Sequence, residues 1–284
     1  MRSQLVSAAN QLMLFLLAFN LLLAFLFSNV NVPFIDFFDT PWFLVVAQVL
    51  GLLLPFLLFS SVGERVTIER ERLDFANVVL IVAISLLLQP FMMFVSGLAS
   101  LVMPNPVEGL IADLLALPVP AALVIIALTP AVCEELVFRG FIQSRYAGQP
   151  LLVTALVNGL FFAMIHFSLH QFAYAFLMGI VFVYMVHFTR SIYSAMLSHF
   201  VINASQFLLA RAASGVETDE SVELIEALFA IGRLALFVLP LLLALGYCFV
   251  KRNYRGKEIF GKHPLDLAFA AVVILYLGLV VFIL

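Results

Sequence analysis

The sequence predicts an all-α fold, a polytopic transmembrane helical bundle of eight to nine spans. Hydrophobic residues make up 64% of the 284 residues, charged residues make up only 11%, and the mean hydropathy is +1.16. Soluble domains carry about 45–50% apolar and about 25% charged residues, so most of this chain requires lipid as its solvent. The net charge of −3 argues against nucleic acid as a partner. The two cysteines lie in apolar segments and form no CxxC motif.

Nine apolar segments approach the length that a membrane-spanning helix needs. The first is too long for the core of a signal peptide and precedes a poor cleavage site, so we interpret it as a retained span. The last is the weakest, and an eight-helix core with a C-terminal addition is an alternative. The segments are 8–27, 42–61, 75–102, 121–147, 151–169, 172–188, 192–210, 233–250 and 267–284.

The distribution of basic residues predicts the orientation. With a cytoplasmic N-terminus, every Lys and Arg except Arg211 and Arg233 falls at a cytoplasmic end of a segment. Cytoplasmic loops retain Lys and Arg, and one misplaced span would disrupt this alternation. The sequence therefore predicts an integral protein of the cell membrane whose N-terminus is cytoplasmic.

Ionisable side chains occur inside three of the apolar segments, where a charge costs at least about 2.5–3.5 kcal/mol on insertion scales. Glu135 and Arg139 are four residues apart with the acid first, the favourable order for a pair on one helix face. Glu134 is turned about 100° away from Glu135 and is expected to lack this partner. A carboxylate without a cation in apolar surroundings is a better base than one in water.

The fourth and fifth segments are expected to form an antiparallel hairpin around the turn at 148–150. Glu134 and His166 lie at equal sequence distances from Pro150. If both stretches are helical, each residue lies about 24 Å from the turn, so the two should face each other. His199 and Asn203 share a helix face at a similar depth. The four polar side chains are therefore predicted to line one pocket in the membrane.

Three motifs in this region resemble those of the CPBP intramembrane proteases. This family includes the type II CAAX prenyl endopeptidases and the Abi proteins linked to bacteriocin self-immunity. The resemblance covers about residues 120–210, which divides the single membrane domain into N-terminal helices 1–119, catalytic core helices 120–210 and C-terminal helices 211–284. The motifs are, in order, Glu134-Glu135-x-x-x-Arg139, Phe162-x-x-x-His166 and His199-x-x-x-Asn203.

The resemblance implies an intramembrane endopeptidase. Glu134 and His166 match the positions implied to activate water, and His199 and Asn203 match those implied to hold the oxyanion. The chemistry agrees, because peptide hydrolysis needs a base for water and donors for the oxyanion. The supporting residues of the same motifs are Glu135, Arg139 and Phe162.

Several alternatives remain open from the sequence. Glu134, His166 and His199 match the ligands of some catalytic zinc sites, so a metalloendopeptidase with a divalent metal such as zinc and a metal-free glutamate protease both fit. The expected partner is a membrane-associated peptide or a lipidated protein, including prenylated CAAX segments. The non-enzymatic alternatives are a proton-coupled transporter and an immunity protein that binds a membrane partner. The sequence has no repeated halves, which argues against a transporter.

Other polar residues in the apolar segments have a simpler interpretation. Asn10, Asn20, Gln48 and Asn158 are predicted to form interhelical hydrogen bonds. His170 follows His166 by four residues but lacks the glutamate of a zinc-binding HExxH helix, and it is expected at the outer membrane edge.

The orientation can be tested with epitope tags. Tags inserted after Arg72 and Lys257 should be inaccessible to antibody in intact cells, whereas a tag near Glu217 should be accessible, because the basic loops are retained in the cytoplasm. Finding Glu217 and Lys257 on the same side would contradict the predicted orientation.

Overall fold

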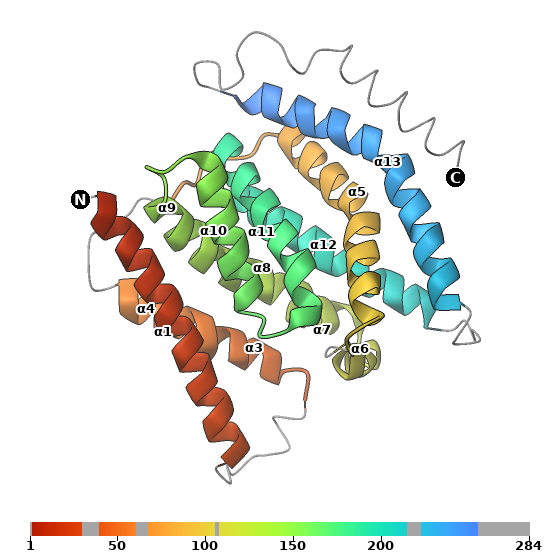
Figure 1. Cartoon of the computed structure of the whole chain (residues 1–284), viewed down its shortest axis with the longest axis horizontal. Coiled ribbons are helices and arrows are strands. Elements are labelled where there is room, and N and C mark those ends of the chain that lie inside the picture. The colour runs from red at the N-terminus through yellow and green to blue at the C-terminus, as the bar shows by residue number, and fades with distance from the viewer. Residues whose placement is uncertain (1, 30–39, 61–67, 106–107, 215–222, 255–284) are drawn as a thin grey trace.

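The computed structural model describes residues 2–29, 40–60, 68–105, 108–214 and 223–254. The regular structure in these ranges is helical, which confirms the predicted fold class (Figure 1). The first part of the chain contains α1 (Arg2–Asn29), α3 (Phe43–Gln48), the π-helical segment η1 (Val49–Leu53), α4 (Leu54–Ser60), α5 (Phe75–Ser100) and α6 (Glu108–Leu115).

The fourth predicted span is a single run in which α-helical and π-helical turns alternate. It consists of α7 (Val119–Leu123), η2 (Val124–Leu128), α8 (Thr129–Glu135), η3 (Leu136–Ile142) and α9 (Gln143–Arg145). The chain continues through α10 (Leu151–Met164), α11 (Leu169–Thr189), α12 (Ile192–Ala213) and α13 (Glu223–Asn253). In Figure 1, α8 and α10–α12 occupy the centre, α1 lies at one flank, and α13 packs against α5 at the other.

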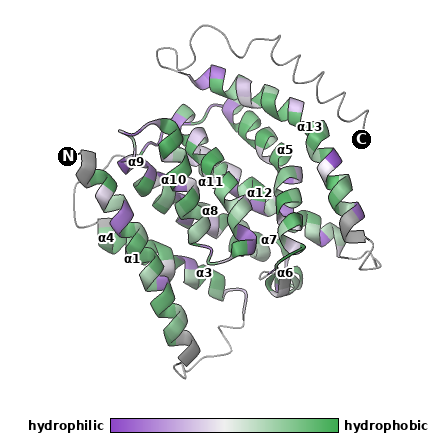
Figure 2. Ribbon diagram, viewed as in Figure 1, coloured by the Kyte–Doolittle hydropathy of each residue, from purple (hydrophilic) through white to green (hydrophobic). Residues whose placement is uncertain are grey.

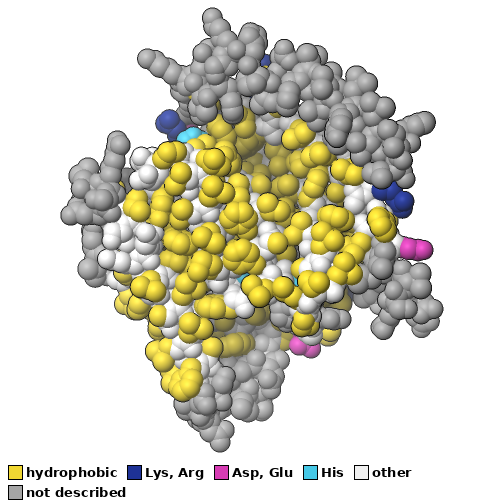
Figure 3. Space-filling model, viewed as in Figure 1, with side chains coloured by type: hydrophobic (Ala, Val, Ile, Leu, Met, Phe, Trp, Pro, Cys, Tyr) yellow, Lys and Arg dark blue, Asp and Glu magenta, His cyan; other side chains and the backbone are white. Residues whose placement is uncertain are grey.

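Six helices in the described ranges are long and apolar enough to cross a membrane: Leu5–Leu26, Phe75–Ser100, Val119–Arg145, Leu169–Thr189, Ile192–Ala213 and Glu226–Asn253. Two further predicted spans form shorter apolar helices, Phe43–Phe59 and Leu151–Met164. The predicted segment 267–284 lies outside the described residues. The structure thus supports an integral membrane protein without confirming the count of eight to nine spans. Apolar residues dominate the helices (Figure 2), and hydrophobic side chains cover most of the described face in Figure 3.

Two prolines inside the helices leave backbone carbonyls that asparagine side chains satisfy. Pro130 has no N–H, so it cannot donate the ordinary i→i−4 bond to the carbonyl of Ile126. Asn203 on α12 donates to this carbonyl at 3.0 Å. Pro55 has the same effect on the carbonyl of Gly51, which accepts a bond of 2.9 Å from Asn20 on α1. Both prolines follow π-helical segments, and both asparagines join distant helices.

Contacts at one end of the bundle bring together basic segments that the sequence assigned to the same side. The N–H of Glu71 donates to the carbonyl of Arg190 at 3.0 Å, between the entry to α5 and the α11–α12 turn. Asp74, the N-cap of α5, pairs with Arg252 near the end of α13 at 2.7 Å. The N–H of Asn77 and then the guanidinium of Arg252 hold the pKa of Asp74 below its usual value. This arrangement agrees with the charge pattern, and the orientation itself stays a prediction.

Two glycines allow α10 and α11 to pack closely. A Cβ built on Gly179 would lie 2.6 Å from the Cα of Gly159, and one built on Gly159 would lie 2.8 Å from the carbonyl oxygen of Phe176. Such distances are too short for a methyl group, so a side chain at either position requires the helix backbones to separate. Small residues at helix interfaces permit close backbone approach in membranes. The same contact positions Phe162, whose Cβ lies 3.3 Å from the Cβ position of Gly179.

Replacing Gly179 by alanine should therefore destabilise the protein by about 1–3 kcal/mol, the usual cost of overpacking. The matched control is Gly246→Ala on α13, where a Cβ meets nothing within 4 Å. This control should be neutral or slightly stabilising, because alanine is the better helix former by about 1 kcal/mol. Thermal unfolding in detergent measures both variants, and equal melting temperatures would contradict the close packing of α10 on α11.

Candidate active site

The first feature of the site is a fully buried ion pair at the junction of α8 and η3. Arg139 Nε lies 3.1 Å from Glu135 Oε2, both side chains are 0% exposed, and Arg139 Nη1 donates to Glu135 Oε1 at 3.2 Å. Arg139 Nη2 also donates to the carbonyl of Gly179 on α11 at 3.0 Å. The pair predicted from the i, i+4 spacing is confirmed. It additionally ties the fourth span to α11.

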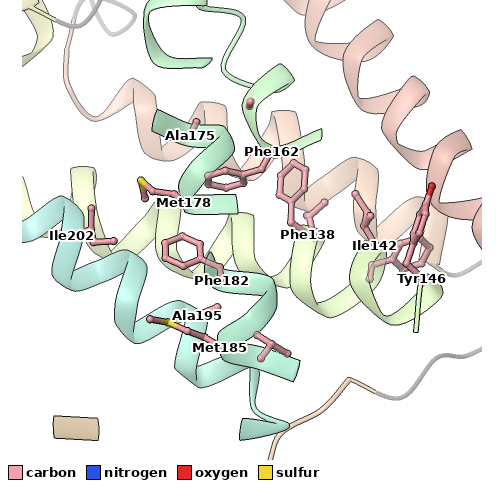
Figure 4. Close-up of a cluster of buried hydrophobic side chains, with 14 of the residues drawn as sticks. Phe138, Ile142, Tyr146, Phe162, Ala175, Met178, Phe182, Met185, Ala195 and Ile202 are labelled. Carbon is pink, nitrogen blue, oxygen red and sulfur yellow. The ribbon is translucent and has the colours of Figure 1, made fainter. Parts of the chain in front are cut away.

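Aromatic rings enclose the Arg139 guanidinium. Its Cζ lies 4.5 Å from the ring centre of Phe162 and 5.0 Å from that of Phe182. Figure 4 shows Phe138, Phe162 and Phe182 converging from three helical segments. Cation–π attraction is strongest when the cation is desolvated, so these rings partly compensate for the loss of water around the charge. Phe162, predicted as a supporting residue, contacts the guanidinium directly.

His199 on α12 is held by Glu135. Its Nδ1 lies 2.9 Å from Glu135 Oε1. Because the carboxylate is paired with Arg139 and accepts the bond, Nδ1 carries the proton. The ring stacks on Phe182 with centroids 5.3 Å apart and planes 28° apart. This leaves Nε2 directed at Glu134, 4.0 Å from its Oε2.

Glu134 has a different environment from that of its neighbour. Its side chain is buried, and the described part of the chain places no Lys or Arg within salt-bridge distance of it. Its Oε1 instead accepts a hydrogen bond of 2.7 Å from Nε2 of Gln48, at the end of α3. The sequence predicted Gln48 only as an interhelical hydrogen bonder. Its position in an apolar segment was the available signal, but its partner could not be read from spacing.

His166 does not lie on a helix as expected, since α10 ends at Met164 and His166 follows in a turn. In a continued helix the carbonyl of Phe162 would accept the backbone N–H of His166; it accepts His166 Nδ1 instead, at 2.7 Å. Phe167 then has a positive φ of 49°, and Ser168 caps α11. Because a carbonyl only accepts, Nδ1 holds the proton and Nε2 presents a lone pair.

The two histidines meet through Phe162 rather than through a direct contact. The ring of Phe162 lies 5.1 Å from that of His166 and 5.8 Å from that of His199, both edge-on. The equal spacing from Pro150 predicted that His166 would face Glu134 across two helices. The structure gives Glu134 contacts with Gln48 and His199, and α10 ends before reaching His166.

Asn203 lies one helical turn beyond His199 and is half-buried. Its Nδ2 donates to the carbonyl of Ile126 in η2, the group that Pro130 leaves without an α-helical donor. An amide nitrogen carries two N–H groups, so this bond fixes the side chain while one donor remains for another acceptor.

The described residues do not form a metal site as placed. No group of three or more His, Cys, Asp or Glu among them is arranged to hold a metal ion. Of the predicted zinc ligands, His199 and Glu134 approach only to 4.0 Å, and His166 has the partner Phe162. As placed, these side chains therefore do not form a coordination shell.

The remaining polar predictions divide between helix contacts and local bonds. Tyr146 donates to Asn10 at 2.6 Å, which confirms an interhelical role for that asparagine. Asn158 donates within its own helix, to the carbonyl of Thr154. His170 is buried and bonds through Nε2 to Ser100 Oγ at 2.9 Å. It thus joins α11 to the end of α5, apart from the glutamates.

Replacing Glu135 by glutamine should strand the Arg139 guanidinium in low dielectric and loosen His199. Removing one partner of a buried pair costs about 3–5 kcal/mol, so the melting temperature in detergent should fall. The double change Glu135→Gln with Arg139→Gln should recover part of that loss because no uncompensated charge remains. A double variant no more stable than Glu135→Gln would show that charge pairing is not the reason for the defect.

Comparison with known families agrees with this geometry. Residues 116–205 match the family model described as type II CAAX prenyl endopeptidase Rce1-like, and this range contains every predicted catalytic residue from Glu134 to Asn203. No curated protein and no solved structure matched the chain. The match gives no support to the Abi branch of the resemblance or to a metalloendopeptidase in particular. It does confirm the predicted resemblance: residues 116–205 of this integral membrane protein are similar to the Rce1-like type II CAAX prenyl endopeptidases, a family of membrane proteases.

Proposed function

We infer that the protein is an intramembrane endopeptidase that hydrolyses a peptide bond of a membrane-anchored substrate by attack of water. The observation that carries this proposal is the environment of Glu134. Its carboxylate is buried, has no salt bridge to a described Lys or Arg, and lies beside the imidazole of His199. A charged group in such surroundings is expensive to keep, so a catalytic use explains its presence better than a structural one.

In the proposed reaction Glu134 takes a proton from water as the water oxygen attacks the carbonyl carbon of the substrate. His166 assists by accepting a hydrogen bond from the same water at Nε2, the nitrogen that its bond to Phe162 leaves with a lone pair. When the C–N bond breaks, the proton on Glu134 passes to the departing amine. The products are a carboxylic acid and an amine, and Glu134 is regenerated.

The oxyanion of the intermediate needs donors that are already in place. Asn203 supplies one amide N–H, with its orientation fixed by the bond to Ile126. His199 is proposed as the second oxyanion residue, with its ring held by the bond between Nδ1 and Glu135 Oε1. Glu135 and Arg139 therefore act on the reaction through His199, whereas Glu134 acts on water.

The proposed substrate class is a membrane-anchored peptide of the CAAX type. The match to the Rce1-like family supports prenylated C-terminal segments as the first substrates to test, and the apolar surroundings of the site suit a lipid-anchored chain. Fluorogenic peptides with and without a prenyl group, both anchored in liposomes that contain the full protein, distinguish this class from general membrane peptides.

Glu134→Gln should lower the rate of peptide cleavage by about 10²–10⁴, the usual worth of a positioned general base. Glutamine retains the volume and can still accept the hydrogen bond from Gln48, so the melting temperature should change little. The measurement is initial cleavage rate together with thermal unfolding of the same preparation. Full activity in Glu134→Gln, or no cleavage of either peptide by the wild-type protein, would overturn the proposed function.

A further inference from the structure

Gln48 donates a hydrogen bond to Glu134, the proposed base, yet Gln48 lies outside the range that matches the family model. Its Nε2 donates to Glu134 Oε1 at 2.7 Å across 86 sequence positions, whereas the match covers residues 116–205. We propose that Gln48 is a positioning residue for Glu134, which orients the carboxylate through this hydrogen bond. This inference rests on the proposed function and adds a residue from the N-terminal helices to that site.

The hydrogen bond from Gln48 gives the two oxygens of the Glu134 carboxylate different surroundings. Oε1 is occupied by Gln48, and Oε2 is left toward His199 Nε2 at 4.0 Å. Without a donor on Oε1, rotation about the last side-chain bond would exchange the two oxygens, since this torsion is broad and two-fold. A fixed Oε2 is what a base needs if it is to meet a water held at one place.

A neutral amide is a suitable partner for a catalytic base. Arg139 pairs with Glu135 through two contacts at 3.1 and 3.2 Å and places a positive charge beside that carboxylate. Gln48 offers a hydrogen bond to the charged form without a formal charge. The neighbouring glutamates thus have partners of different kinds, and each kind suits the role proposed for its glutamate.

The acceptor of Gln48 differs from that of a comparable interhelical amide. Gln48 and Gln143 both have a buried Oε1 without a hydrogen-bond partner among the described residues, so both carry the same desolvation cost. Their nitrogens differ: Gln48 donates to the Glu134 carboxylate, whereas Gln143 donates to the backbone carbonyl of Val183. The contact with the proposed base is therefore specific to Gln48.

The backbone around Gln48 is anchored from a second helix. The π-helical segment η1 follows Gln48 directly, and Asn20 on α1 binds the Gly51 carbonyl that Pro55 leaves without a donor. α1 therefore fixes η1, and η1 fixes the position at which Gln48 meets α8. Through this chain of contacts the N-terminal helices support the proposed base.

The test compares Gln48→Met with Gln143→Met in the full protein in liposomes. Gln143 is also an interhelical amide, with Nε2 donating to the Val183 carbonyl at 3.1 Å, but it does not contact Glu134. Gln48→Met should lower kcat for the fluorogenic anchored peptide by about 10–100-fold, the effect of losing one hydrogen bond to a charged group, with little change in KM. Gln143→Met should keep both the kcat and the KM of the wild type.

A spectroscopic measurement decides the proposal even if no peptide is cleaved. The carboxyl band of Glu134 in the infrared difference spectrum at one fixed pH is assigned by its loss in Glu134→Gln. In Gln48→Met this band should shift in frequency, because the hydrogen bond to Oε1 is lost. If Gln48→Met does not accumulate, Gln48→Asn, whose amide is one methylene shorter, gives the same readout. An unshifted band would overturn the role of Gln48, whereas absent cleavage by the wild type with a shifted band would overturn only the peptidase function.

Discussion

The site depends on the contacts that the buried carboxylate of Glu135 makes with two other helical side chains. It binds Arg139 on its own helical run and His199 on α12, and Arg139 in turn binds the backbone of α11. Three of the central helical segments therefore meet at one negative charge. In a membrane a buried charge without partners would be too costly, so the helices that supply those partners must pack around Glu135. The packing in turn fixes where Glu134 and Nε2 of His199 lie.

Aromatic side chains make this arrangement of charges tolerable. Phe162 lies over the Arg139 guanidinium and contacts both histidines edge-on, while Phe182 stacks on His199. Close packing of α10 on α11 through Gly159 and Gly179 holds Phe162 in place, so a backbone contact without polar groups still influences the polar centre.

Irregular helix geometry supplies the remaining polar contacts. Gln48 precedes η1, Ile126 lies in η2, and Glu135 precedes η3. π-helical turns frequently occur at functional sites, and prolines after η1 and η2 leave carbonyls that need new donors. Asn20 and Asn203 provide these donors. The carbonyls that lack an α-helical donor thus bind side chains of distant helices. One of these bonds orients Asn203, which lies one turn from His199.

The sequence by itself determined the class of the protein and the residue types of its site. Composition required a membrane-embedded helical fold, and helix phase correctly separated Glu135, paired with Arg139, from Glu134. These inferences depend on local periodicity, which a sequence records directly. The roles assigned to Glu134, His166, His199 and Asn203 stay predictions.

Only the tertiary structure decided which polar groups meet. Spacing from Pro150 placed His166 on a continued helix, whereas α10 ends at Met164 and the His166 side chain, instead of its backbone N–H, binds the Phe162 carbonyl. Spacing also gave no indication that Gln48 would reach Glu134. Both outcomes depend on long-range packing and on the end of a helix, where side chains compete with the backbone for the same acceptors. Local periodicity contains neither kind of information.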